Sequence, residues 1–168
     1  ARGLMPLDDG FHVSRRLART VGQGRFVCTV DRAFDAVVAA CADRPEGTWI
    51  SPEIRIAYRR LHRWGLAHSV EAWRGGCVGQ GSPVGGLYGV TLGGVFFAES
   101  MFHRVTDAGK VALVHLVDRL RRLDYRLCDV QWTTPNLRRF GAFDMPAREY
   151  MRRLAEALPL DRRFCDAE

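Results

Sequence analysis

One apolar run constrains this chain more than any other feature. It reads Val95-Phe96-Phe97-Ala98-Glu99-Ser100-Met101-Phe102 and follows two glycines. Apolar runs of this length bounded by glycines are typical of buried strands. Glu99 interrupts the run, and burying a carboxylate costs several kcal/mol unless it is paired or hydrogen-bonded. The run therefore predicts a buried carboxylate with a fixed donor or ligand, or else an edge strand whose glutamate faces water.

A second polar feature ends a later strand, predicted over residues 125–131. Asp129 and Gln131 lie two positions apart in it. Residues two apart on a strand point to the same face, so we expect this carboxylate and this amide to project together as a compact pair. The alternative is an ordinary solvated strand end.

Apolar spacing and capping residues predict helices over residues 14–20, 31–42, 52–63, 106–123 and 147–158. Strands are predicted over residues 25–30, 67–73, 84–92, 95–100 and 125–131, and near Phe143. This mixture and the chain length indicate an α/β (α+β) fold with a single domain. We place the domain over residues 11–160, between a flexible amino terminus over residues 1–10 and a flexible tail over residues 161–168.

The charge of the chain comes almost wholly from arginine. The formal net charge is +6, and Lys110 is the only lysine. Arginine pairs bidentately with phosphate, so the basic composition fits a nucleic-acid partner, although a coding bias toward arginine explains it equally well. No apolar run reaches the roughly 20 residues of a membrane span, so we expect no membrane association and a cytoplasmic location.

The five cysteines are far apart, with no CxxC motif and no Cys/His cluster. The sequence therefore indicates neither a disulfide framework nor a zinc site. We expect no bound metal. The thiols should be reduced, and several of them should be buried.

Five short motifs occur in one order along the chain: Gly47-Thr48-Trp49-Ile50, Ala67-His68-Ser69-Val70-Glu71-Ala72-Trp73, Val84-Gly85-Gly86-Leu87-Tyr88-Gly89-Val90, Phe97-Ala98-Glu99-Ser100-Met101-Phe102 and Cys128-Asp129-Val130-Gln131. Together they resemble the leucyl/phenylalanyl-tRNA–protein transferases over nearly the whole chain. That family resembles the GNAT acyltransferase fold and moves an aminoacyl group from charged tRNA onto a free amino terminus. The resemblance implies a GNAT-like domain whose mixed, mostly antiparallel sheet is flanked by helices.

The resemblance also implies roles for individual residues. Gln131 would orient the attacking amine as a catalytic residue, while Asp129 polarises that amine or attracts its positive charge. Trp49 would stack on the terminal adenosine of the tRNA. The full set implied to bind the aminoacyl-tRNA is Trp49, Tyr58, Leu87, Tyr88, Phe96, Glu99, Met101, Lys110, Leu113, Leu116, Leu120, Cys128 and Asn136. Because an aminoacyl ester is already activated, we expect no cofactor and no covalent catalysis.

The acceptor of the aminoacyl group is open to more than one interpretation. The amino-terminal motifs of the family are missing here, which favours a short, stand-alone member acting on a small peptide, unless the chain is a fragment of an ordinary family member. Pacidamycin-type transferases of peptide-antibiotic synthesis, which extend a free amine of a small peptide, are an example of such an enzyme. We also expect a monomer. The alternative acceptor is a protein whose first residue is lysine or arginine. Two further alternatives are a GNAT acetyltransferase, disfavoured because the coenzyme A signature is absent, and a non-catalytic tRNA-binding module.

Overall fold

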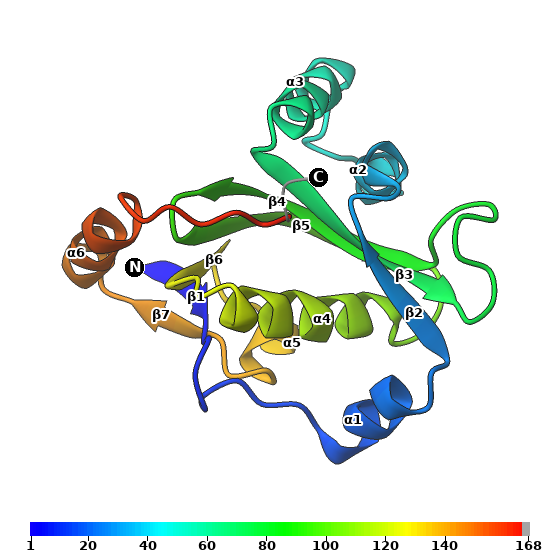
Figure 1. Ribbon diagram of the computed structural model, residues 1–168, viewed down its shortest axis with the longest axis horizontal. Helices are drawn as coiled ribbons and strands as arrows, with labels where there is room; N and C mark the ends of the chain where they lie inside the picture. Colours follow the sequence, from blue (N-terminus) through cyan, green and yellow to red (C-terminus); the bar gives the residue numbers. More distant parts are fainter. Residues whose placement is uncertain (166–168) are drawn as a thin grey trace. The chain divides into compact units, whose positions relative to one another are not determined.

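The computed structural model describes residues 1–165 of the 168-residue chain (Figure 1). The strands are β1 (Arg2–Met5), β2 (Phe26–Val30), β3 (Ala67–Arg74), β4 (Gly85–Leu92), β5 (Val95–His103), β6 (Leu127–Gln131) and β7 (Phe143–Met145). The helices are α1 (Arg15–Gly22), α2 (Phe34–Ala42), α3 (Pro52–Arg63), α4 (Ala108–Arg122), α5 (Pro135–Arg138) and α6 (Ala147–Ala157). The predicted α/β class is confirmed.

The strands hydrogen-bond in the order β2-β3-β4-β5-β6-β1-β7. Strand β2 is antiparallel to β3, β3 is antiparallel to β4, and β1 is antiparallel to both β6 and β7. Strands β5 and β6 pair in parallel, through α4 as the crossover between them. The sheet is thus mixed and mostly antiparallel, as the sequence predicts, while the kinship with GNAT acyltransferases stays a prediction.

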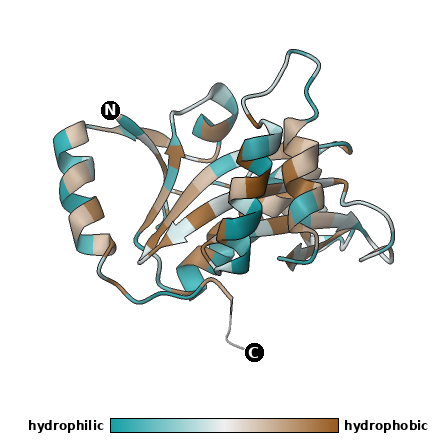
Figure 2. Cartoon of the chain, turned by 90° about the horizontal axis from the view of Figure 1, so that it is seen from above, coloured by the Kyte–Doolittle hydropathy of each residue, from teal (hydrophilic) through white to brown (hydrophobic). Residues whose placement is uncertain are grey.

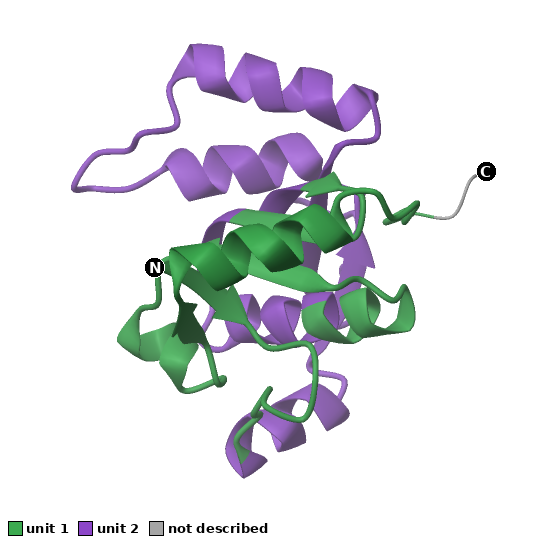
Figure 3. Cartoon of the chain, turned by 90° about the vertical axis from the view of Figure 1, so that its left-hand side faces the viewer, with its two compact units in different colours: residues 1–14, 91–98, 117–168 green, residues 15–90, 99–116 purple. Residues whose placement is uncertain are grey.

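The chain divides into two compact units, coloured separately in Figure 3. Unit 1 contains residues 1–14, residues 91–98 and the chain from Val117 onward, and unit 2 contains residues 15–90 and 99–116. Each unit has an apolar cluster of its own. In unit 2 the buried cluster comprises Phe34, Val37, Val38, Ala40, Cys41, Ile50, Ala67, Tyr88 and Phe102. In unit 1 it comprises Leu4, Val95, Leu127, Met145, Tyr150 and Ala157.

Local sequence explains several helix bounds. Ser51 caps α3 by accepting a hydrogen bond from the Ile54 N–H, and Pro52 occupies the first turn, where its missing N–H costs nothing. Helix α6 carries both hydrophilic and hydrophobic residues (left in Figure 2). Its buried residues, Tyr150 and Ala157, are seven positions apart and therefore lie on one side of the helix. Helix α2 differs from the prediction because it begins at Phe34, and Asp31 does not cap it. The carboxylate of Asp31 instead binds the Ser69 N–H and the His68 ring.

The amino terminus differs most from the prediction. Residues Arg2–Met5 form strand β1, paired on both sides, so the expectation of a flexible start is wrong for them. Leu4 and Met5 are each 2% exposed. Four residues are too few to show a strand periodicity, and their burial depends on partners that lie more than 120 positions along the chain.

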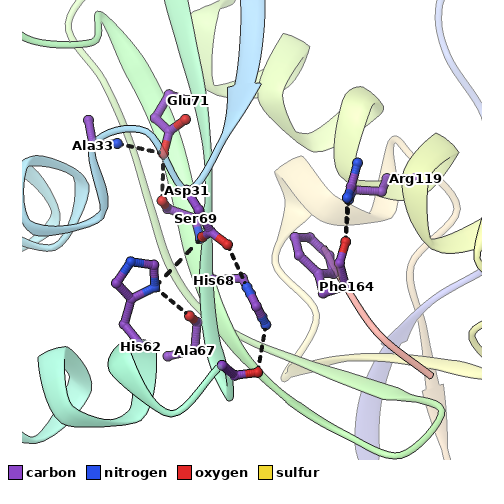
Figure 4. A network of polar contacts seen from close by, with 10 residues as sticks. Asp31, Ala33, His62, Ala67, His68, Ser69, Glu71, Arg119 and Phe164 are labelled. Carbon is purple, nitrogen blue, oxygen red and sulfur yellow. Dashed lines mark hydrogen bonds and ion pairs between the residues drawn. The ribbon is translucent and has the colours of Figure 1, made fainter. Parts of the chain in front are cut away.

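The carboxyl-terminal stretch also differs from the prediction where it is described. Phe164 is buried, its ring stacks on that of Phe96 at 5.4 Å, and Arg119 donates hydrogen bonds to its carbonyl oxygen (Figure 4). A flexible tail therefore does not begin at residue 161. Residues 166–168 of the predicted tail lie outside the described residues. Among the described helices, none has both the length and the apolar character needed to cross a membrane.

Candidate functional site

The carboxylate of Asp129 lies at the centre of a hydrogen-bond network in unit 1. Its side chain is 0% exposed. The Arg2 Nε donates to both of its oxygens, at 3.0 and 2.8 Å, and the Tyr150 hydroxyl donates to Oδ2 at 2.6 Å. The backbone N–H of Gln131 donates to Oδ1 at 2.7 Å. Asp129 is therefore compensated by one cation and by neutral donors, and it fixes the backbone of Gln131.

Gln131 has an uncommon backbone conformation for a non-glycine residue, with φ 68°. The pairing of β1 with β6 shifts register beside it, so that Gly3 faces Gln131 while the next residue, Leu4, faces Asp129. This bulge interrupts the two-residue alternation on which the predicted common face of Asp129 and Gln131 depends. The side chains contact different groups as a result: the Gln131 Nε2 donates to the Ala98 carbonyl oxygen at 3.3 Å.

Gly3 permits this arrangement. A Cβ added at Gly3 would lie 2.7 Å from the carbonyl carbon of Trp132, closer than real side chains come. Only glycine lets β1 approach the chain directly after Gln131, so Gly3 acts on the backbone around the predicted catalytic amide.

Burial also affects the ionisation of the neighbours of Asp129. Burial raises the pKa of Tyr150 to about 12, and its hydrogen bond to Asp129 and the negative charge of Asp129 contribute to this shift. Burial raises the pKa of the Cys128 thiol to about 12, and the Asp129 charge adds to this effect. Cys128 therefore stays a protonated thiol and is no nucleophile at neutral pH.

A ladder of three aromatic rings, Trp49, Tyr58 and Tyr88, lies in unit 2. Trp49 is 52% exposed and Tyr88 is 0% exposed, with the half-buried Tyr58 between them. The ring centroids of Trp49 and Tyr58 are 6.4 Å apart, and those of Tyr58 and Tyr88 are 5.0 Å apart, both in edge-to-face geometry. The aromatic ladder thus runs from the surface into the core of unit 2, and Trp49 presents an exposed ring as the resemblance implies.

Hydrogen bonds from Arg44 connect the loop that carries Trp49 to strand β5. Arg44 donates from Nη2 to the Met101 carbonyl oxygen at 3.0 Å and to the Ser100 Oγ at 3.3 Å, and its Nε donates to the Cys41 carbonyl oxygen. These contacts hold the end of α2 and the start of the loop against β5, within the same unit.

Glu99 lies on β5 and is half-buried. It is therefore neither the fully buried carboxylate nor the water-facing glutamate that the sequence allows. Its nearest ionisable neighbour on the aromatic ladder is Tyr58, whose pKa it affects. Burial raises the pKa of Tyr58, and the negative charge of Glu99 raises it further. A partly exposed carboxylate beside an aromatic ladder suits a cationic ligand group.

The remaining residues predicted to bind aminoacyl-tRNA fall into two groups. The apolar ones are buried in their own units: Leu87, Leu113 and Leu116 in unit 2, and Phe96, Leu120 and Cys128 in unit 1. The others are accessible: Met101 is half-buried, and Asn136 is exposed on α5. Lys110 lies in the first turn of α4, with Nζ 3.6 Å from Asp107, whose carboxylate also pairs with Arg16.

A second buried carboxylate, Glu71, has no role predicted from the sequence. This side chain is 0% exposed and accepts a hydrogen bond from the Thr29 hydroxyl at 2.5 Å. It also accepts hydrogen bonds from the Ser69 hydroxyl at 2.5 Å and from the Ala33 N–H at 3.3 Å (Figure 4). Trp73 donates to the Thr29 hydroxyl in turn, at 2.7 Å. The network joins β3, β2 and the start of α2 inside unit 2.

His68 extends the same network. Its Nδ1 lies 2.7 Å from an Asp31 carboxylate oxygen, and its Nε2 lies 3.0 Å from the Gly65 carbonyl oxygen. The motif from Ala67 to Trp73 thus builds the scaffold of unit 2. The sequence carries no clear signal for this network, because polar residues that alternate with apolar ones, as they do in this motif, are typical of a strand with one solvated face.

We expect the charge of Glu71 to make stability depend on pH. Burial raises the pKa of Glu71, so the folded state holds the proton more tightly than the unfolded state does. The contribution of Glu71 is then greatest below its unfolded pKa of about 4.3 and declines as pH rises through its folded pKa. Urea unfolding of the wild type and of Glu71→Gln should show the variant gaining stability relative to the wild type as pH rises from acidic to neutral.

Glu53→Gln is the control of opposite sign for this experiment. A hydrogen bond from Ser51 lowers the pKa of the exposed Glu53, so that variant should lose stability relative to the wild type as pH rises. A difference between Glu71→Gln and the wild type that is constant with pH would contradict the prediction.

Arginines gather on the exposed side of α3, which begins three residues after Trp49. They are Arg55, Arg59, Arg60 and Arg63, of which Arg59 pairs with Asp35 at 3.0 Å. By contrast, the arginines in a 420 Å³ cleft of unit 1 are ion-paired, Arg126 with Asp124, Arg152 with Glu149 and Glu156, and Arg153 with Glu149. The α3 face is therefore the better candidate for a phosphate-binding surface.

Comparison with known proteins gives matches over most of the chain. Residues 4–155 match the model of a protein family described as leucyl/phenylalanyl-tRNA protein transferase. A relative from Rubrobacter xylanophilus is 56% identical over 156 residues, covering 93% of this chain and 79% of the relative. Relatives from Ruegeria pomeroyi and Akkermansia muciniphila are 51% and 50% identical, each covering 94% of this chain and 71% and 80% of the relative. All three bear the name leucyl/phenylalanyl-tRNA–protein transferase.

Proposed function

This chain belongs to the leucyl/phenylalanyl-tRNA–protein transferase family and is thus a tRNA-dependent aminoacyltransferase, and we propose that it transfers leucine or phenylalanine to the free α-amine of a protein. The fixed conformation of Gln131 is the main structural support for aminoacyl transfer. Its backbone is held by Asp129, and its side-chain amide is held by the Ala98 carbonyl.

The reaction needs alignment more than activation. The α-amine nitrogen attacks the ester carbonyl carbon, a C–N bond forms, and the C–O bond to the terminal ribose breaks. One proton passes from the nitrogen to the departing ribose oxygen, which leaves as a hydroxyl. An amide is too weak a base to remove a proton by itself, so Gln131 acts by accepting a hydrogen bond from the attacking N–H through Oε1.

Asp129 acts through Gln131 in this mechanism. Its oxygens are occupied by Arg2, Tyr150 and the Gln131 N–H, and it is 0% exposed. Direct polarisation of the amine would require Asp129 to give up one of these donors. The carboxylate therefore positions the catalytic amide.

In this proposal, side chains of unit 2 bind the terminal adenosine, the α-ammonium group and the phosphate backbone of the charged tRNA. The exposed ring of Trp49 offers a stacking surface for the terminal adenosine, and such stacking contributes roughly 1–3 kcal/mol. Glu99 pairs with the α-ammonium group of the aminoacyl moiety. The arginines of α3 contact the tRNA backbone, which requires an affinity that falls steeply with salt.

Identity of 50–56% to relatives named as protein transferases supports a protein acceptor. The sequence alone favours a small-peptide acceptor, but the family relationship supports the alternative, a protein acceptor, better. We extend the proposal to proteins that begin with lysine or arginine, as the family resemblance implies, and to a cytoplasmic, monomeric enzyme that needs no cofactor.

A competition experiment tests the proposal. The purified protein receives tRNA charged with labelled leucine, phenylalanine or alanine, together with an arginine-initiated protein and a small free-amine peptide, and mass spectrometry reads both acceptors. Leucine or phenylalanine should appear on the arginine-initiated protein. An acceptor with an acetylated amino terminus is the control and should stay unmodified. Preferred alanine transfer to the small peptide would overturn the proposed acceptor, and binding of charged tRNA without any transfer would overturn the proposed activity.

A further inference from the structure

The chain turns back over strand β1 directly after Gln131. The Trp132 N–H donates to the Val130 carbonyl oxygen at 2.8 Å, across Gln131 with its φ of 68°. A three-residue turn with this hydrogen bond and a positive central φ is rare and strained. The chain then crosses Gly3, where the backbone of Trp132 leaves no room for a side chain. The proposed catalytic amide is thus followed by a segment with a fixed backbone, whose first side chain is Trp132.

This tryptophan is unusually accessible. Trp132 is 68% exposed, whereas tryptophan is highly buried on average in proteins. The face of an indole ring attracts a cation that lies over it, such as a lysine ammonium or an arginine guanidinium group. An exposed indole next to the amide proposed to align the acceptor amine therefore offers a contact for a cationic group of the acceptor.

A carboxylate lies on the other side of Gly3 from Gln131. In the register of the sheet, Gly3 faces Gln131 of β6 on one side and Asp144 of β7 on the other, all within unit 1. Two strand spacings, roughly 10 Å, therefore separate the backbones of Gln131 and Asp144. The Thr133 hydroxyl donates to the Asp144 Oδ1 at 3.0 Å, so the segment that follows Gln131 reaches this carboxylate. Trp132 is thus attached between the amide and the carboxylate.

Asp144 already holds a guanidinium group. The Arg138 Nη2 donates to the Asp144 Oδ2 at 2.5 Å. This hydrogen bond is the main reason why the pKa of Asp144 lies below its usual range, so the carboxylate is charged at neutral pH. The side chains of both partners are exposed, and exposed ion pairs contribute little to stability. A cation of the acceptor can therefore replace Arg138 on Asp144 at small cost.

We propose that Trp132 and Asp144 bind the cationic side chain of the acceptor's first residue, lysine or arginine, while Gln131 aligns the α-amine of that residue. The inference rests on the proposed function and names the residues that select the acceptor. The indole face contacts the cation, and the carboxylate pairs with it in place of Arg138. The long stems of lysine and arginine can span the separation between the α-amine and Asp144, whereas short side chains cannot.

Two acceptor peptides that differ only in the charge of the first side chain test the inference. One begins with arginine and the other with citrulline, the neutral analogue of the same length. The wild type should show a kcat/KM about 10-fold higher for the arginine peptide, because two contacts of about 2–5-fold each act on the charge. That preference should fall to about 3-fold in Asp144→Asn and in Trp132→Leu, and to about 1 in the double variant. The rate with the citrulline peptide should barely change.

Arg138→Gln should have the opposite effect. It removes the cation that competes for Asp144, so the preference for the arginine peptide should rise about 2–5-fold. Asp124→Asn is the matched control for Asp144→Asn. Asp124 is likewise an exposed carboxylate of unit 1 that pairs with arginines, and the loss of its charge should leave the preference unchanged.

Three outcomes would overturn the inference. They are an unchanged preference in the double variant, an equal loss of rate with both peptides, and a fall in the preference on Arg138→Gln. Calorimetric binding of the two peptides without tRNA separates the inference from the proposed function. A wild type that binds the arginine peptide more tightly through Asp144, but transfers no amino acid to it, would count against the proposed function alone.

Discussion

Replacing Gln131 with alanine is expected to lower the rate of aminoacyl transfer by about 10²-fold, the loss associated with misplacing a reacting group by about 1 Å. The amide that aligns the attacking amine is lost, together with its bond to the Ala98 carbonyl. The Asp129 bond to the backbone N–H of residue 131 is kept, so the free energy of unfolding should fall by only about 1 kcal/mol. Single-turnover kinetics with charged tRNA, beside urea unfolding, measures both quantities.

Thr133→Ala is the matched control for that variant. Thr133 lies two residues further on, and its hydroxyl donates to Asp144 at 3.0 Å, so the change also removes one side-chain hydrogen bond. Its transfer rate should stay within a few-fold of the wild type. A Gln131→Ala enzyme as active as the Thr133→Ala enzyme would rule out Gln131 as the aligning group.

Asp129→Ala should be the most destabilising of these substitutions. It leaves the Arg2 guanidinium, the Tyr150 hydroxyl and the Gln131 N–H without their acceptor, at a cost of about 2–4 kcal/mol given that Arg2 is partly exposed. Asp129→Asn keeps the size and one acceptor oxygen, so it should cost less. Urea unfolding of both variants, with Tyr150→Phe as the variant that removes a single bond to Asp129, measures this order.

The effect of Asp129 on transfer should pass through Gln131. The double variant Asp129→Ala/Gln131→Ala should therefore be no slower than Gln131→Ala alone, measured where both remain folded. Two effects that multiply would instead show that Asp129 acts on the amine independently, as the sequence analysis proposes.

The sequence by itself determined much of the local structure. Ser51 and Pro52 place the start of α3 at the predicted residue, because a cap and a first-turn proline act within one helical turn. The apolar run from residue 95 is a strand, and only its end is misjudged, since β5 continues to His103. The order of motifs along the chain was enough to identify the family, because it is a property of the sequence alone.

Only the tertiary structure decided which polar groups meet. Arg2 is bonded to Asp129 across 127 positions, and no local pattern reports such a partner. The conformation of Gln131 depends on a bulge opposite Gly3, which alternation along one strand cannot reveal. Glu71 is the fully buried carboxylate of unit 2 and Glu99 only a half-buried one, because burial is set by the elements packed on each side of a strand and not by the apolarity of its neighbours in sequence.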